Sequence, residues 1–196
     1  MLSLKVVHAG ADWWLQGRCQ FTYCNDHLLT RNVQETSESV IEMHDDNPDH
    51  FEIMLKYLYT KHYQISEKSR LAPQLVENFI HPIGVHLLAD KYEVEGLCSA
   101  AVDAFGCLSH WDPEKCAFKL DVAGLNEMVG VHYGACEIVG SGMGNCIVDF
   151  LFQHRKFHTM ASDIKRLVHR FPAFGADIVM EEIRLGCLGS CTKKHR

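Results

Sequence analysis

The sequence lacks any apolar run long enough to cross a membrane, because a spanning helix needs about 20 consecutive apolar residues. It also lacks an excess of positive charge: the formal net charge of the 196 residues is −6, and the one basic run is the tail 193–196. Proteins that bind nucleic acid without sequence preference use a basic face to displace counterions. We therefore expect neither a membrane nor a nucleic acid as a partner.

The start of the chain lacks the features of an export signal. No charged beginning precedes an apolar stretch, and Asp12 follows early, next to two tryptophans. The nine cysteines show no repeated paired spacing, so reduced and mostly buried thiols are expected. With 47% hydrophobic and 22% charged residues, the composition is that of an ordinary globular protein. We expect an intracellular protein, cytoplasmic or nuclear, and not a secreted one.

Cysteine and histidine are frequent enough to raise the alternative of a metal-binding or degraded enzyme domain. Two groups combine both residue types: Cys19, Cys24 and His27, and Cys187, Cys191 and His195. Zinc sites favour compact Cys-x2-Cys pairs, with a second pair at loop distance, and neither group has that spacing. No carboxylate pair or nucleophile with an ordered base stands out either. We therefore expect no metal, no cofactor and no catalytic residues.

Three glycines at positions 140, 142 and 144 precede a helical pattern, where backbone N–H groups can hold phosphate. A dinucleotide fingerprint needs its third glycine three residues after the second, but position 145 is Asn. The favoured interpretation is a turn that starts a helix.

The clearest local signals come before residue 60. Residues 40–43 alternate like a short strand, and residues 4–7 form a second strand candidate. Asn47 is a good N-cap, and Pro48 suits the first helical position. The next residues predict a helix with an apolar stripe of Phe51, Met54, Leu55 and Leu58.

Helical patterns continue toward the C-terminus. The dipeptide His81-Pro82 marks the restart of a helix, whereas residues 131–139 indicate extended chain. Apolar residues at helical spacing indicate a last helix that carries Phe174, Ile178, Val179 and Ile183. These signals divide the chain into three parts: an atypical segment without a readable pattern at 1–34, a patterned region at 35–107, and a helical extension at 108–196.

Four motifs follow one another within residues 35–107. They read Ser39-Val40-Ile41-Glu42-Met43, Asp45-Asp46-Asn47-Pro48-Asp49-His50-Phe51, Met54-Leu55-Lys56-Tyr57-Leu58-Tyr59-Thr60 and Leu88-Ala89-Asp90-Lys91-Tyr92. In this order they are similar to the motifs of a BTB/POZ domain of the short fungal type. Residues 1–34 depart from that family, whose front part normally holds a β-hairpin and a helix. The resemblance implies an α+β fold of the BTB/POZ (Skp) type: a helical cluster against a small, incomplete β-sheet, followed by a C-terminal helical extension.

The resemblance also implies a function. Such domains are non-catalytic protein–protein interaction modules, which act as adaptors for cullin-type ubiquitin ligases or as homo-oligomerisation domains. The expected partners are therefore proteins, either a cullin scaffold or a second copy of the chain. The corresponding positions supply the candidate contact residues Val33, Glu35, Tyr59, His62 and Tyr63. The alternative is that Tyr59 packs in the core and the others are ordinary surface.

Overall fold

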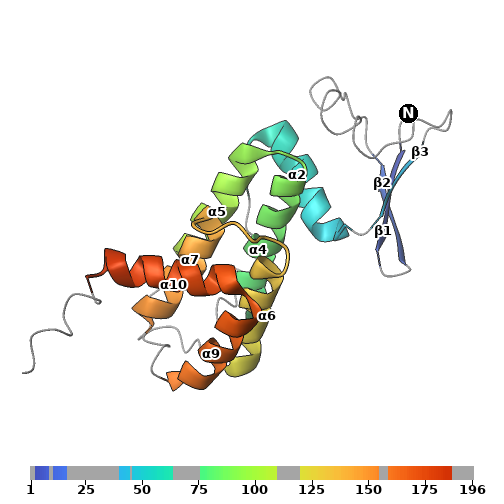
Figure 1. The fold of residues 1–196 in the computed structure, drawn as a ribbon. Coiled ribbons are helices and arrows are strands. Elements are labelled where there is room, and N and C mark those ends of the chain that lie inside the picture. Colours follow the sequence, from blue (N-terminus) through green and yellow to red (C-terminus); the bar gives the residue numbers. More distant parts are fainter. Residues whose placement is uncertain are drawn as a thin grey trace, which may run out of the picture.

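The computed structural model describes residues 46–63, 76–109, 120–154 and 159–186, together with the backbone of three strands. The strands are β1 (Ser3–His8), β2 (Ala11–Gln16) and β3 (Val40–His44). The helices follow along the chain as shown in Figure 1: α2 (Pro48–Thr60), α4 (Val76–Lys91), α5 (Glu95–Ser109), α6 (Val122–Tyr133), α7 (Gly142–Gln153), α9 (Ala161–Arg170) and α10 (Pro172–Arg184).

The expected α+β fold, a helical cluster packed against a β-sheet, is wrong. Helices account for 80% of residues 46–63, 76–109, 120–154 and 159–186, and none of these residues lies in a strand. The reason lies in the packing, because the apolar faces of the helices are buried against one another. All described core side chains come from the helices or from the turns that join them. The folded body is therefore helical.

The three strands pair through their backbones in the order β2-β1-β3. Strand β1 runs antiparallel to β2 and parallel to β3. Figure 1 shows this small sheet beside α2, at one end of the helical body. Strands β1 and β3 coincide with the two segments for which the sequence pattern predicts strands, so the local prediction holds although the predicted fold class does not.

Helix α2 begins where the sequence signals place it. The Asn47 side chain accepts hydrogen bonds from the backbone N–H groups of Asp49, at 2.9 Å, and His50, at 3.3 Å. These bonds satisfy two of the donors that every helix start leaves without an intrahelical acceptor. Phe51, Met54 and Leu55 of the predicted apolar stripe are buried, and Leu58 is partly buried against the core. This element was predictable because its signals lie within a few residues of one another.

Helix α4 corrects a second expectation. The helix does not restart at Pro82 but runs from Val76 to Lys91 with this proline inside it. An internal proline removes one backbone hydrogen bond and typically costs about 3 kcal/mol. Pro82 is buried between Phe79 and Ile83, which are also buried. Burial of this apolar face offsets the cost of the proline.

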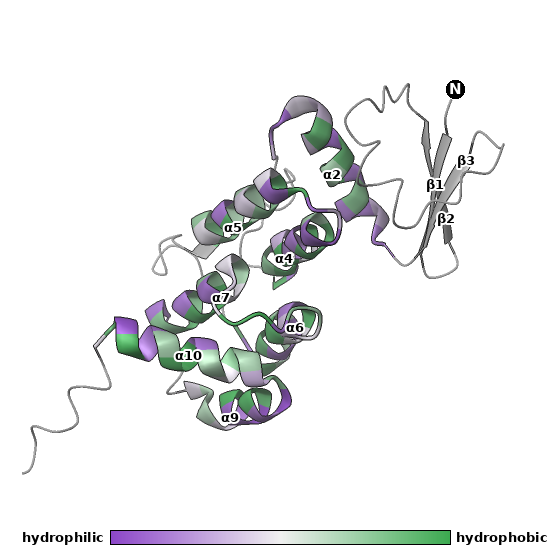
Figure 2. Ribbon diagram, turned by 45° about the horizontal axis from the view of Figure 1, so that its top comes forward, coloured by the Kyte–Doolittle hydropathy of each residue, from purple (hydrophilic) through white to green (hydrophobic). Residues whose placement is uncertain are grey.

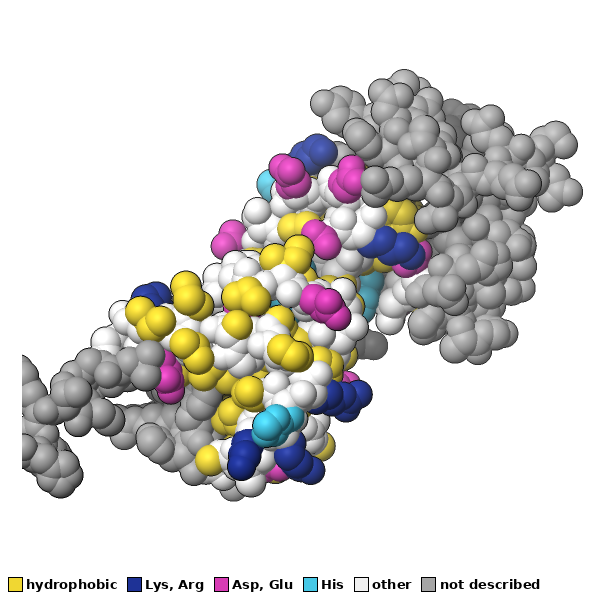
Figure 3. Space-filling view, in the orientation of Figure 1, with side chains coloured by type: hydrophobic (Ala, Val, Ile, Leu, Met, Phe, Trp, Pro, Cys, Tyr) yellow, Lys and Arg dark blue, Asp and Glu magenta, His cyan; other side chains and the backbone are white. Residues whose placement is uncertain are grey.

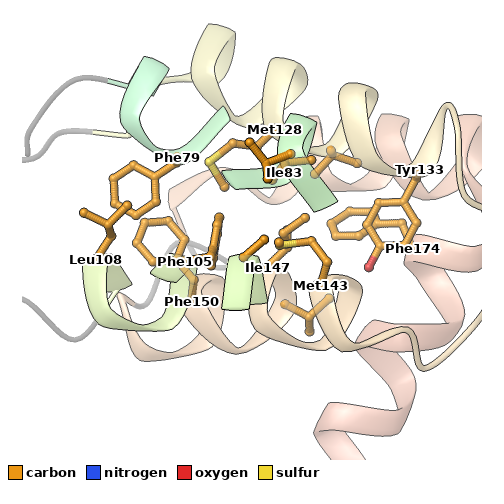
Figure 4. Close-up of a cluster of buried hydrophobic side chains, with 14 of the residues drawn as sticks. Phe79, Ile83, Phe105, Leu108, Met128, Tyr133, Met143, Ile147, Phe150 and Phe174 are labelled. Atoms are coloured by element: carbon orange, nitrogen blue, oxygen red, sulfur yellow. The ribbon is translucent and has the colours of Figure 1, made fainter. Parts of the chain in front are cut away.

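One continuous core joins α4, α5, α6, α7 and α10 (Figure 4). Three phenylalanines from different helices meet toward one end of it (Figure 4), where the ring of Phe79 lies 5.6 Å from that of Phe105 and 5.1 Å from that of Phe150. Figure 4 shows Tyr133 and Phe174 at the other end of this cluster. The core thus extends into the C-terminal helices and determines which of their faces point outward.

The segment 131–139 is also not extended as expected. Residues 131–133 complete α6, and turns and irregular chain lead from there to α7. Helix α9 is amphipathic, and Figure 2 shows it alternating between hydrophobic and hydrophilic residues. Ile164 and Leu167 are its buried residues, so its polar residues face outward.

Candidate partner-binding surfaces

Three of the predicted contact residues lie at the C-terminal end of α2. Tyr59 is 56% exposed and His62 is exposed, so the alternative of a core position for Tyr59 is wrong. Tyr63 is partly buried and packs against the core, and this burial raises the pKa of its phenol to about 12. Tyr63 therefore stabilises the fold, whereas Tyr59 and His62 are accessible to a partner. Val33 and Glu35 lie outside the described residues.

A tight turn follows α2 and lies next to the exposed residues Tyr59 and His62. Lys61 adopts the left-handed backbone conformation, with φ 56°, and its N–H donates to the carbonyl of Tyr57 at 2.7 Å. The hydroxyl of Thr60 donates to the carbonyl of Lys56 at 2.8 Å and accepts from the N–H of His62 at 3.2 Å. These bonds hold the backbone at the α2 end in one conformation.

A buried carboxylate connects α2 to α4. Asp46 is 4% exposed, and it accepts hydrogen bonds from the Lys91 ammonium at 2.7 Å and from the Tyr92 hydroxyl at 2.6 Å. Burial, followed by this hydrogen bond to Asp46, raises the pKa of Tyr92. Two motifs that the sequence analysis singled out therefore meet in space, where they hold the start of one helix against the end of another.

Two histidines face each other between α4 and α6. The rings of His86 and His132 lie 6.1 Å apart, and His132 has no exposed surface. Its Nε2 is 3.0 Å from the hydroxyl of Ser141, whereas its Nδ1 is buried without a hydrogen-bond partner among the described residues. Burial, and secondarily His86, lowers the pKa of His132 to about 4. The imidazole is thus held neutral inside the fold.

The described part of the chain offers no observation in favour of a metal-binding domain, the alternative raised in the sequence analysis. Within residues 46–63, 76–109, 120–154 and 159–186, no three His, Cys, Asp or Glu side chains are grouped as metal ligands. Both cysteine and histidine groups, at 19–27 and 187–195, lie outside the described residues. The glycines at 140–144 form the helix-start turn that was expected, since Ser141 is the N-cap of α7 and accepts from the Gly144 N–H at 3.0 Å.

Asp177 of α10 is the polar residue that the sequence analysis missed. It is 1% exposed and accepts hydrogen bonds from the Tyr133 hydroxyl and from the Gly140 N–H, each at 2.7 Å. Burial and this hydrogen bond to Asp177 raise the pKa of Tyr133. Gly144 leaves room for the network, since a Cβ atom there would lie 2.7 Å from Asp177 Oδ2.

The buried Asp177 determines the rotation of α10 about its axis. Phe174 and Ile178 are buried beside it, whereas Val179 and Ile183 of the same predicted helix are exposed. In a helix, residues five apart point about 140° away from each other, so Phe174 and Val179 do not share a face. The sequence held a signal for this arrangement, because apolar residues lie on more than one side of this helix and cannot all face the same core.

The outward side of α10 is apolar along its length. We call this surface the outer face of α10 and define it by residues spaced along one side of the helix: Pro172, Ala176, Val179, Met180 and Ile183. The exposed fractions of Val179, Met180 and Ile183 are 48%, 58% and 56%. Figure 3 shows hydrophobic side chains gathered over α10. Leu185 and the loop residues Ile138 and Val139 are also exposed.

A pocket of about 440 Å³ lies at the N-terminal end of α10. Its lining combines two outer-face residues with neighbouring side chains: Tyr133, Glu137, Val139, Arg170, Phe171, Pro172, Ala173 and Ala176. The Arg170 guanidinium lies 5.0 Å from the centre of the Phe171 ring, within the range of a cation–π contact. The outer face of α10 is therefore hollowed at one end, next to a cation, and is covered by larger apolar side chains toward the other end.

Charges of opposite sign flank the two ends of this face. At the N-terminal end, α9 exposes Lys165, Arg166, His169 and Arg170, of which Arg166 pairs with Asp163. At the C-terminal end, Arg184 pairs with Glu181 and, at 3.2 Å, with Asp149, and Glu182 lies nearby on the same helix. Basic residues therefore outnumber acidic ones on α9, and acidic residues outnumber basic ones at the end of α10.

Comparisons of the chain with protein-family models, with curated proteins and with solved structures found no match. None of the described helices is both long and apolar enough to span a membrane.

Proposed function

We propose that this protein is a non-catalytic protein–protein interaction module. The observation that carries the proposal is the outer face of α10, a set of large apolar side chains left in contact with water. Single exposed apolar residues are common, but a contiguous patch on a soluble surface usually marks a contact site. Full burial of a Val, Ile or Met side chain is worth about 1.5–3 kcal/mol, so covering three half-exposed ones provides a few kcal/mol toward binding.

The α2 end carries a second proposed contact surface. Tyr59 lies in the last turn of α2 and His62 just after it, and Figure 1 shows α2 at the opposite end of the body from α10. Tyrosine is enriched at protein interfaces because it combines a large apolar ring with a polar hydroxyl group. Two separate surfaces are what an adaptor requires. We propose that the α2 end docks a cullin-type scaffold, as the sequence resemblance implies, while the outer face of α10 contacts another protein.

Calorimetric titration of the purified chain with a purified cullin N-terminal region tests the adaptor role. We expect saturable binding that Tyr59→Ala weakens by about tenfold or more, as for an interface residue that contributes over 1 kcal/mol. Met180→Glu is the matched control, because it changes an equally exposed apolar residue on the other surface, and it is expected to leave cullin affinity unchanged.

Two results would count against this assignment. The adaptor role is refuted if the wild-type chain does not bind the cullin region at all. The position of the docking surface is refuted if Met180→Glu weakens cullin binding and Tyr59→Ala does not. In the second case the chain is still an interaction module, but the scaffold contacts α10.

A further inference from the structure

We propose that the outer face of α10 binds the same face of a second copy, in an antiparallel pair related by a two-fold axis. This inference rests on the proposed function and names the partner of one of its surfaces. A two-fold interface requires a surface that is complementary to itself, because each copy contributes the same residues. The shape and the charge of the outer face of α10 both meet this requirement.

The shape argument follows from the order of small and large residues along the helix. Helix α10 has 13 residues and is therefore about 20 Å long. When two such helices run antiparallel and are centred on the exposed stripe, Val179 of one copy faces Met180 of the other. Ala176 then faces Ile183, so a small residue meets a large one at both ends. Such alternation lets the side chains of two helices interlock.

The pocket strengthens this complementarity. It lies at the N-terminal end of α10, where the small side chains of Ala173 and Ala176 leave a depression in the surface. In the antiparallel arrangement, the C-terminal end of the second helix covers this region and brings its Ile183, which is 56% exposed. A volume of about 440 Å³ is large enough to take apolar side chains of this size. Each copy thus offers a hollow at one end and projecting apolar groups at the other.

The charges support the same orientation. The basic end, with Lys165 and Arg170, would lie beside the acidic end of the other copy, where the carboxylates of Asp149, Glu181 and Glu182 outnumber the guanidinium of Arg184. A parallel pair would instead place like charges together, which is unfavourable. Charges of this kind at the rim of an interface mainly determine orientation and the rate of association, while the apolar centre provides most of the affinity.

Sedimentation velocity over a concentration series tests the proposal on the full chain. We expect a monomer–dimer equilibrium in the wild type that is populated by about 100 µM, as expected for a weak or transient interface. Ile183→Glu should raise the dimer dissociation constant by roughly 100-fold, since the change occurs twice in a two-fold pair and loss of each apolar contact is worth about tenfold. Ile183 is exposed, so the variant is expected to fold.

Val122→Glu is the matched control. Val122 is 39% exposed at the start of α6, away from the outer face of α10, and its replacement should leave the dissociation constant unchanged. A charge exchange then tests the orientation. Lys165→Glu and Glu182→Lys should each weaken the dimer severalfold, and the double variant should recover much of the loss, because the antiparallel pair brings these two ends together.

The outcomes separate this inference from the proposed function. A chain that stays monomeric at about 100 µM, or a dimer that Ile183→Glu does not weaken, overturns the α10 pair. If such a chain still binds the cullin region, the proposed function stands and only the second-copy assignment fails. If it neither self-associates nor binds that region, both fail. A dimer that Ile183→Glu disrupts and Val122→Glu does not, with recovery in the charge exchange, supports the inference.

Discussion

Acid should destabilise this protein through His132 well before its carboxylates are protonated. The imidazole has no exposed surface, and burial lowers its pKa from 6.5 to about 4. The unfolded chain therefore binds a proton at this position more readily than the folded chain does. Stability is fully present above pH 6.5 and is lost as the pH falls from there toward 4.

The size of the loss follows from the two pKa values. A difference between 6.5 and about 4 corresponds to roughly 3 kcal/mol once the pH is below both values. At pH 5 the unfolded chain is almost fully protonated at this histidine and the folded chain is mostly not, so about 2 kcal/mol is already lost. Domains of this size are stable by about 5–15 kcal/mol, which makes this a measurable fraction. The pKa of His86 is lowered in the same direction.

Urea unfolding followed by far-ultraviolet circular dichroism at pH 7, 6 and 5 measures this loss. The expected result is that His132→Gln, which does not titrate and keeps a polar group facing Ser141, loses about 2 kcal/mol less than the wild type between pH 7 and 5. His169→Gln is the matched control, because it makes the same replacement at a histidine that is exposed on α9. Equal losses in the wild type and His132→Gln would refute the reasoning.

Three further stability measurements follow from named contacts. Asp177→Ala should cost about 2–4 kcal/mol in urea unfolding, because it leaves the Tyr133 hydroxyl and the Gly140 N–H without their acceptor; a loss below 1 kcal/mol would show that water replaces the carboxylate. Gly144→Ala should lower the melting temperature, at a cost of about 1–3 kcal/mol, since the added Cβ would lie 2.8 Å from Ser141 Oγ, and an unchanged melting temperature would contradict this packing. Glu52→Gln removes an exposed ion pair of 2.6 Å with Lys56 and should change stability by less than about 0.5 kcal/mol.

Local signals predicted individual helices well. Asn47 and Pro48 determine the start of α2 through contacts within three residues, so the sequence alone was sufficient. Burial of Phe51 and Met54 follows from spacing along the same helix. Pro82 shows where such rules fail, because its effect on α4 depends on burial against other helices and not on its neighbours in the chain.

The candidate surface was harder to predict, because it depends on contacts between distant residues. Asp177 binds groups at positions 133 and 140, which are 44 and 37 residues away. Without those partners in view, the carboxylate is expected on the surface and Val179 in the core. The fold class was wrong for a related reason: the apolar stripe of α2 was identified from local spacing, but nothing local states whether helices or a sheet cover it.

The buried carboxylate of Asp177 affects which substitutions this protein can accept during evolution. It holds α10 from the inner side, together with Phe174 and Ile178, so the residues on the opposite side carry little of the folding free energy. Under the proposed function, folding and recognition use different sides of one helix. If the proposed function holds, substitutions at Met180 or Ile183 alter the choice of partner while the stability of the domain stays nearly constant, so recognition is free to diversify.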